Sequence, residues 1–79
     1  MILINLDSLE KVNNLVKICE RYQADFDIEY GRYVINGKSV LGVSSLLGNI
    51  VKVLPDTDDQ LMLGYIVRDL KEIGAWLAE

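Results

Sequence analysis

Ser39 is the side chain with the clearest potential for chemistry. It lies in the run Gly37-Lys38-Ser39-Val40-Leu41-Gly42-Val43-Ser44, and Val40, Val43 and Leu47 follow it at helical spacing. A serine directly before such a run is typical of a helix N-cap. A phosphate on the same hydroxyl would suit the positive end of the helix dipole. The sequence predicts the cap and leaves phosphorylation as a second role that can coexist with it.

The other reactive groups predict no catalytic site. The chain has no histidine, which excludes imidazole acid–base catalysis, histidine metal ligation and a phosphohistidine intermediate. Cys19 is the single cysteine and lies on an apolar stripe, so we expect a buried structural thiol. Asp56, Asp58 and Asp59 lack the glycine and spaced glutamate of a calcium loop, which favours helix capping. We expect no enzyme activity, no cofactor and no metal.

The composition predicts one small domain over residues 1–79. It is 51% hydrophobic, with a mean hydropathy of +0.21, which predicts a dense core and leaves apolar surface for a partner. The net charge is −4 and the basic residues are scattered, so nucleic acid is not an expected partner. No apolar run approaches membrane length, and Met1 to Asn5 lacks signal-peptide features. We expect a cytoplasmic location, with a protein partner or a homodimer.

The first half of the chain predicts a strand, a helix and a hairpin. Ile2–Leu6 reads as a strand, and Asp7 is expected to cap a helix over about Ser8–Tyr22, with Glu10 three residues on. Residues Asp25 to Tyr30 alternate between acidic and apolar side chains, which predicts a strand with one solvated face. Gly31 then supplies the turn into a strand over residues 32–35.

The dipeptide Asn36-Gly37 allows two interpretations. Asn-Gly is the strongest two-residue hairpin signal, which would make Lys38 to Val43 a third hairpin strand. The helical spacing after Ser39 favours instead a helix over about Val40–Leu47.

The second half predicts a strand and the longest helix. Asn49–Leu54 reads as a strand that Pro55 ends, and Thr57 with Gln60 has the spacing of a capping box. The last helix is expected to reach about Ala78. Its stripe includes Tyr65 and Trp76, which would lie nearly in line; core packing and a dimer contact are the two interpretations.

The order of elements and the middle of the chain resemble the histidine-containing phosphocarrier protein HPr of the bacterial sugar phosphotransferase system. The residues that carry the resemblance are Arg21-Tyr22-Gln23-Ala24-Asp25 and the run from Gly37 to Leu46, with its Lys-Ser-hydrophobic-hydrophobic-Gly pattern. The resemblance implies an α+β, HPr-like open-faced β-sandwich. Its antiparallel sheet would have the strand order 1-4-2-3, with three helices on one face, which favours the helix after Ser39.

The resemblance also implies a site. Ser39 matches the regulatory phosphorylation site of many family members, and the short helix after it matches their partner-docking patch. The implied partner-binding residues are Lys38, Ser39, Val40, Leu41 and Ser44. Leu41 keeps the apolar character of that patch, whereas Ser44 breaks it.

One departure from the family changes the expected function. The family's phosphoryl-carrying histidine lies between the first strand and the first helix, beside an arginine, and here that segment is only Leu6-Asp7-Ser8-Leu9-Glu10-Lys11. Lys11 is protonated at neutral pH and is no substitute nucleophile. We therefore expect a non-catalytic regulatory or protein-binding domain whose partner is a phosphotransferase-system protein or an HPr-kinase-like protein. The alternative is a self-associating structural domain.

Overall fold

Three helices and one five-stranded antiparallel sheet make up the computed structural model, which describes residues 1–79. The elements are β1 (Ile2–Asn5), α1 (Leu9–Arg21), β2 (Asp25–Tyr30), β3 (Tyr33–Asn36), α2 (Val40–Ser44), β4 (Ile50–Asp56), α3 (Gln60–Glu72) and β5 (Trp76–Leu77). The strands lie in the order β3-β2-β4-β1-β5. The predicted order 1-4-2-3 is confirmed, and β5 adds an edge strand beside β1.

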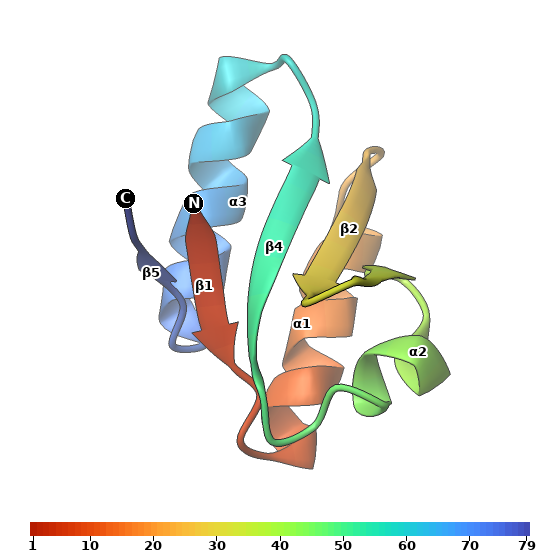
Figure 1. Cartoon of the computed structure of the whole chain (residues 1–79). Coiled ribbons are helices and arrows are strands. Elements are labelled where there is room, and N and C mark those ends of the chain that lie inside the picture. Colours follow the sequence, from red (N-terminus) through yellow and green to blue (C-terminus); the bar gives the residue numbers. More distant parts are fainter.

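The helices cover one face of the sheet, with α1 and α3 behind the strands in Figure 1 and α2 beside the lower part of α1. Alternate residues of the strands point toward the helices and form the core with the inner faces of α1 and α3. Its largest fully buried side chains include Ile4, Leu6, Leu15, Phe26, Ile28, Ile66 and Leu70. The opposite alternation of β2 leaves Asp25 and Asp27 exposed, as the sequence pattern predicts. The expected α+β class is confirmed.

The N-cap of α1 is Ser8, so the prediction of Asp7 is wrong. Ser8 has extended backbone angles, and its Oγ accepts a hydrogen bond from the N–H of Lys11 at 3.2 Å. Asp7 lies one residue too early to reach that amide, and its carboxylate instead lies 3.4 Å from Lys11 Nζ. The cap therefore fixes the start of α1 at Leu9.

Between β2 and α2 the predicted elements are present with shifted ends. Gly31 supplies the hairpin turn with φ +57°, and β3 covers residues 33–36. The expected helix over Val40–Leu47 ends at Ser44. Short-range hydrogen bonds follow, from Leu46 N to Val43 O at 3.0 Å and from Leu47 N to Ser44 O at 3.1 Å. The chain then turns at Gly48, where φ is +91°.

Strand β4 continues through Pro55 to Asp56, contrary to the prediction that proline ends it. Pro55 lies opposite Phe26 of β2, and the carbonyl of Phe26 accepts from Gly37 N on its other side. The N–H and C=O groups of Phe26 therefore point away from β4, and neither requires a hydrogen bond from Pro55. The pairing of β1 with β4 stops at Val53, so neither neighbour of Pro55 requires the N–H that proline lacks.

Helix α3 is capped by Asp59, not by the expected Thr57–Gln60 box. Asp59 Oδ1 accepts from the N–H groups of Leu61 and Met62 at 3.0 and 3.1 Å. The hydroxyl of Thr57 accepts from Asp59 N at 3.1 Å and so orders the turn before the cap.

The same helix ends at Glu72, six residues before the predicted end. Gly74 has φ +102°, and the amides of Gly74 and Ala75 close back on Lys71 and Leu70 in a Schellman arrangement. Trp76 and Leu77 then pair with β1 as β5. Trp76 therefore does not share a helix face with Tyr65, and the expected alignment of these two side chains is wrong.

Candidate functional site

The turn before α2 uses Asn36-Gly37 to leave the sheet, not to form a hairpin. Asn36 Oδ1 accepts from Lys38 N at 2.9 Å, and Asn36 O accepts from Ser39 N at 3.0 Å. A Cβ on Gly37 would lie 2.8 Å from Phe26 Cβ and 2.9 Å from the sulfur of Cys19. Glycine is needed here because the chain passes directly over β2 and α1.

Ser39 is the N-cap of α2, as predicted. Its Oγ accepts a hydrogen bond from Gly42 N at 3.1 Å, and the side chain is half-buried. The hydroxyl thus satisfies one of the amides that a helix start leaves without a partner. Its phosphorylation stays a prediction.

Gly42 sets the orientation of α2. A Cβ at this position would lie 2.7 Å from Cγ2 of Ile35 and 3.0 Å from Ser39 Oγ, so the helix backbone packs directly on β3. Val43 next to it is fully buried. This packing turns the opposite side of α2 outward.

The residues expected to bind a partner therefore lie together on and before α2. Leu41 is 87% exposed and Val40 is also exposed, which gives the helix an apolar outer surface. Ser44 is half-buried and donates its hydroxyl to Val40 O at 2.7 Å, so it offers little to a partner. Lys38 lies at the base of the helix and donates from Nζ to Tyr22 O at 3.2 Å.

Two further leucines are exposed in the segments that adjoin α2, one at the start of α1 and one directly after α2. The amide of Leu6 donates to Asn49 O at 2.9 Å, and Leu6 O accepts from Gly48 N at 2.7 Å, so the β1–α1 connection lies against the loop after α2. Leu9 and Leu47 flank these bonds and are exposed. Leu47 follows the end of α2, so helical spacing no longer sets its direction. We call Leu9, Val40, Leu41 and Leu47 the α2 surface.

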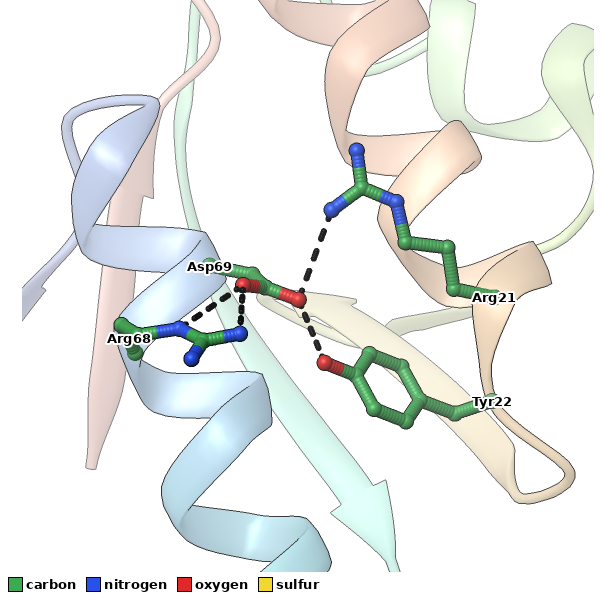
Figure 2. Close-up of polar contacts among 4 residues, drawn as sticks. All are labelled: Arg21, Tyr22, Arg68 and Asp69. Carbon is green, nitrogen blue, oxygen red and sulfur yellow. Dashed lines mark hydrogen bonds and ion pairs between the residues drawn. The ribbon is translucent and has the colours of Figure 1, made fainter.

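A second polar cluster joins α1 to α3 around Asp69 and was missed by the sequence reasoning (Figure 2). Asp69 is only 5% exposed and is the single buried charged residue. Its Oδ2 accepts from the hydroxyl of Tyr22 and from Arg21 at 3.4 Å, and its Oδ1 accepts from Arg68 Nε and a terminal nitrogen at 3.3 and 3.1 Å. An acid three residues after Ile66, on the apolar side of α3, was the available signal.

This cluster fixes charge states. The hydrogen bond from Tyr22 and the two guanidinium groups lower the pKa of Asp69, which keeps the carboxylate ionised. Burial and the same hydrogen bond raise the pKa of Tyr22. Both oxygens of the buried carboxylate have hydrogen-bond partners. The cluster therefore links two helices, and Asp69 is not a reactive acid.

Cys19 is fully buried, as predicted. Burial raises the pKa of its thiol to about 12, so the thiolate needed for redox chemistry does not form at neutral pH.

A cleft of about 320 Å³ lies between the β2–β3 hairpin and the loop after α2. Tyr30, Tyr33, Ile35, Ser45, Leu46 and Asn49 line it. No carboxylate, amine or thiol faces it, so the cleft offers no group that works as an acid or base near neutral pH. No group of three or more acidic or cysteine side chains in the chain could hold a metal ion.

The layers, strand order and capped α2 define an open-faced β-sandwich with three helices on one side of an antiparallel sheet. More specifically, the chain has the fold of HPr. HPr-C-His from Thermoanaerobacter tengcongensis superposes with a TM-score of 0.68 at 20% identity, covering 90% of this chain and 85% of that one.

A second solved structure of this fold is the catabolite repression protein Crh of Bacillus subtilis, described as a dimer with a swapping domain. It gives a TM-score of 0.61 at 22% identity, over 82% of this chain and 79% of that one. No protein-family profile matches the sequence, and no curated protein matches it. None of the helices has the length and apolar character needed to span a bilayer.

Proposed function

We propose that this protein is a non-catalytic, HPr-like regulatory module that binds a partner protein through the α2 surface together with Lys38 and Ser39. The observation that carries the proposal is Leu41, which is 87% exposed on a helix fixed by a capping serine and a packed glycine. A short, rigid helix that presents a leucine to solvent suits a docking role.

The second part of the proposal is that phosphorylation of Ser39 controls this docking. The hydroxyl lies directly before Val40 and Leu41, so a phosphate there would add about −1.5 to −2 charges beside the apolar contact. The same phosphate could accept hydrogen bonds from the first amides of α2. Lys38, the neighbouring residue, would add a positive charge within reach.

The chemistry of the β1–α1 connection supports a regulator over a phosphoryl carrier. Asp7 is in an ion pair with Lys11, Ser8 caps α1, and the chain contains no histidine. A transferable phosphoryl group would need a nucleophile held beside cationic groups, and this connection has no histidine and a single cation, Lys11, which is already paired with Asp7.

Two incubations test the proposal. An HPr kinase with ATP should add one phosphate to the protein, detected by mass spectrometry, and Ser39→Ala should abolish it while Ser44→Ala should not. Phosphoenolpyruvate with the general phosphotransferase enzyme should add none. No phosphate from the kinase would remove the switch, and labelling from phosphoenolpyruvate would contradict the regulator assignment.

Docking is tested separately with purified phosphotransferase-system proteins and the HPr kinase, by calorimetry. Leu41→Ala should weaken binding by about tenfold, since an exposed anchor side chain contributes about 1–2 kcal/mol. Leu61→Ala is the matched control, because Leu61 is 68% exposed but lies on α3. Equal losses in both variants would exclude the α2 surface as the docking site.

Self-association is the second candidate function, and the dimer described for Crh supports it. The strand β3 has a free edge, and its Tyr33 and Val34 are exposed. Sedimentation over a concentration series tests it: Val34→Lys should reduce any dimer, and a monomer at all concentrations would exclude this candidate.

A further inference from the structure

The sheet has one face that no helix covers (Figure 1). Because successive side chains of a strand alternate between the two faces, each strand contributes side chains to this open face. Strand pairing places one row across this face, in the order Val34, Glu29, Lys52, Leu3 and Trp76. The open face is on the opposite side of the sheet from α1 and α3, and it is distinct from the α2 surface.

Half of the open face is apolar. Leu3 pairs directly with Trp76 on β5 and with Lys52 on β4, and Ile50 and Leu54 lie on either side of Lys52 along β4. Ile50 and Trp76 are exposed, and Leu3 and Leu54 are half-buried. We call Leu3, Ile50, Leu54 and Trp76 the open-face patch. Contiguous exposed apolar residues of this kind, above all with a tryptophan, mark binding surfaces.

The other half of the open face is acidic. Asp25 lies directly opposite Asp56, and Asp27 lies opposite Leu54 of the open-face patch. None of these three exposed aspartates takes part in an ion pair, whereas Glu29 lies 3.7 Å from Lys52. The strand side chains of this face thus carry four carboxylates and one ammonium group, a net charge of −3. Like charges directly opposite each other weaken a sheet, so this arrangement gives the free protein no stability.

We propose that the open face binds a basic amphipathic helix of a partner protein. The apolar side of that helix would cover the open-face patch, and its lysine or arginine side chains would reach Asp25, Asp27 and Asp56. A helix satisfies its own backbone hydrogen bonds, whereas an extended segment lying flat on the face would leave its own without partners.

The charge on the face selects this occupant over the alternatives. A second copy stacked on the same face would bring two surfaces of −3 together. The phosphates of nucleic acid or of an anionic membrane would be repelled in the same way. Only a cationic amphipathic partner both buries the apolar half of the face and forms favourable charge contacts with the acidic half.

The probe for the experiment is a synthetic amphipathic helix of leucine and lysine without tryptophan. Trp76 is the only tryptophan of the protein and belongs to the open-face patch, so its emission should shift to shorter wavelength when the helix covers it. Binding should weaken as salt rises. A helix with glutamate in place of lysine should not bind; equal binding of the two helices would overturn the proposal.

Two double variants with the same change of charge locate the site. Asp25→Asn with Asp27→Asn should weaken binding of the leucine–lysine helix by about three- to tenfold, because two surface charge contacts are lost. Glu10→Gln with Glu20→Gln, on α1, should leave the affinity unchanged. Equal weakening by both pairs, or no shift of Trp76 emission on binding, would overturn the proposal. Urea unfolding of each variant confirms that it is folded.

Discussion

Replacing Asp69 with alanine should destabilise the protein by about 2–4 kcal/mol. The hydrogen bond from the Tyr22 hydroxyl to the buried carboxylate contributes most, since bonds to a charged group are worth about 1.5–3 kcal/mol. Arg21 and Arg68 are 59% and 61% exposed and rehydrate when the carboxylate is lost, so each pair adds only about 0–1 kcal/mol. For a chain of 79 residues this predicts a fall in Tm of about 10–20 °C.

Urea denaturation at pH 7 measures the loss, and double-mutant cycles divide it. The cycle of Asp69→Ala with Tyr22→Phe should give a coupling of about 1–2 kcal/mol, and the cycle with Arg21→Ala less than about 0.5 kcal/mol. Glu20→Gln is the control, since this exposed acid on α1 takes part in no ion pair and should change stability by less than about 0.5 kcal/mol.

The same difference must depend on pH in one direction. The pKa of Asp69 is lowered in the folded protein, chiefly by the Tyr22 hydrogen bond, so the folded state binds fewer protons than the unfolded state. The stabilisation is therefore complete above the ordinary carboxyl range near pH 4 and is lost as the pH falls through the folded pKa. A gap between wild type and Asp69→Ala that stays constant from pH 7 to pH 2, or a larger coupling to Arg21 than to Tyr22, would refute this account.

Three other perturbations have expected outcomes. Gly42→Ala should cost about 1–3 kcal/mol in urea denaturation, because its Cβ would lie 2.7 Å from Ile35 Cγ2; a neutral change would mean that α2 moves freely on β3. Ser39→Ala should lower the free energy of unfolding by about 1 kcal/mol through the lost cap, and the size of this loss should change little with pH. The Cys19 thiol should resist iodoacetamide in the folded protein at pH 8 and react in urea. Its pKa is raised from 9.0 to about 12, so stability should decline as pH rises between these values.

Local sequence signals predicted most of the fold where the deciding interaction is also local. The alternation from Asp25 to Ile28, the turn at Gly31 and the cap at Ser39 each depend on neighbours within a few residues, and all three are confirmed. Asn36-Gly37 shows the limit of such signals. Its hairpin preference is overridden by the close passage of Gly37 over Phe26, which no local pattern reports.

Some errors are local, such as the caps at Ser8 and Asp59, and others involve partners that are distant in sequence. Pro55 remains in β4 because the pairing of β1 with β4 does not extend beyond Val53, so no neighbouring strand needs the N–H that proline lacks. This depends on sheet register. Helical spacing predicts Trp76 on α3, whereas Gly74, with φ +102°, ends the helix before it. Asp69 was missed because its partner Tyr22 lies 47 residues away. The apolar α2 surface is predicted in part: the resemblance implies Leu41, whereas helical spacing groups Leu47 with the buried Val43 and no local pattern indicates that Leu9 is exposed.

Strand β1 is synthesised before both of the strands with which it pairs, β4 and β5. Both partners come from the far half of the chain, since Ile2 pairs with Val53 on one side and with Leu77 on the other. Until β5 has been synthesised, the apolar strand has at least one open edge, and such an edge can pair with another chain. Trp76 and Leu77 therefore close the edge of β1 at which nascent molecules could exchange strands.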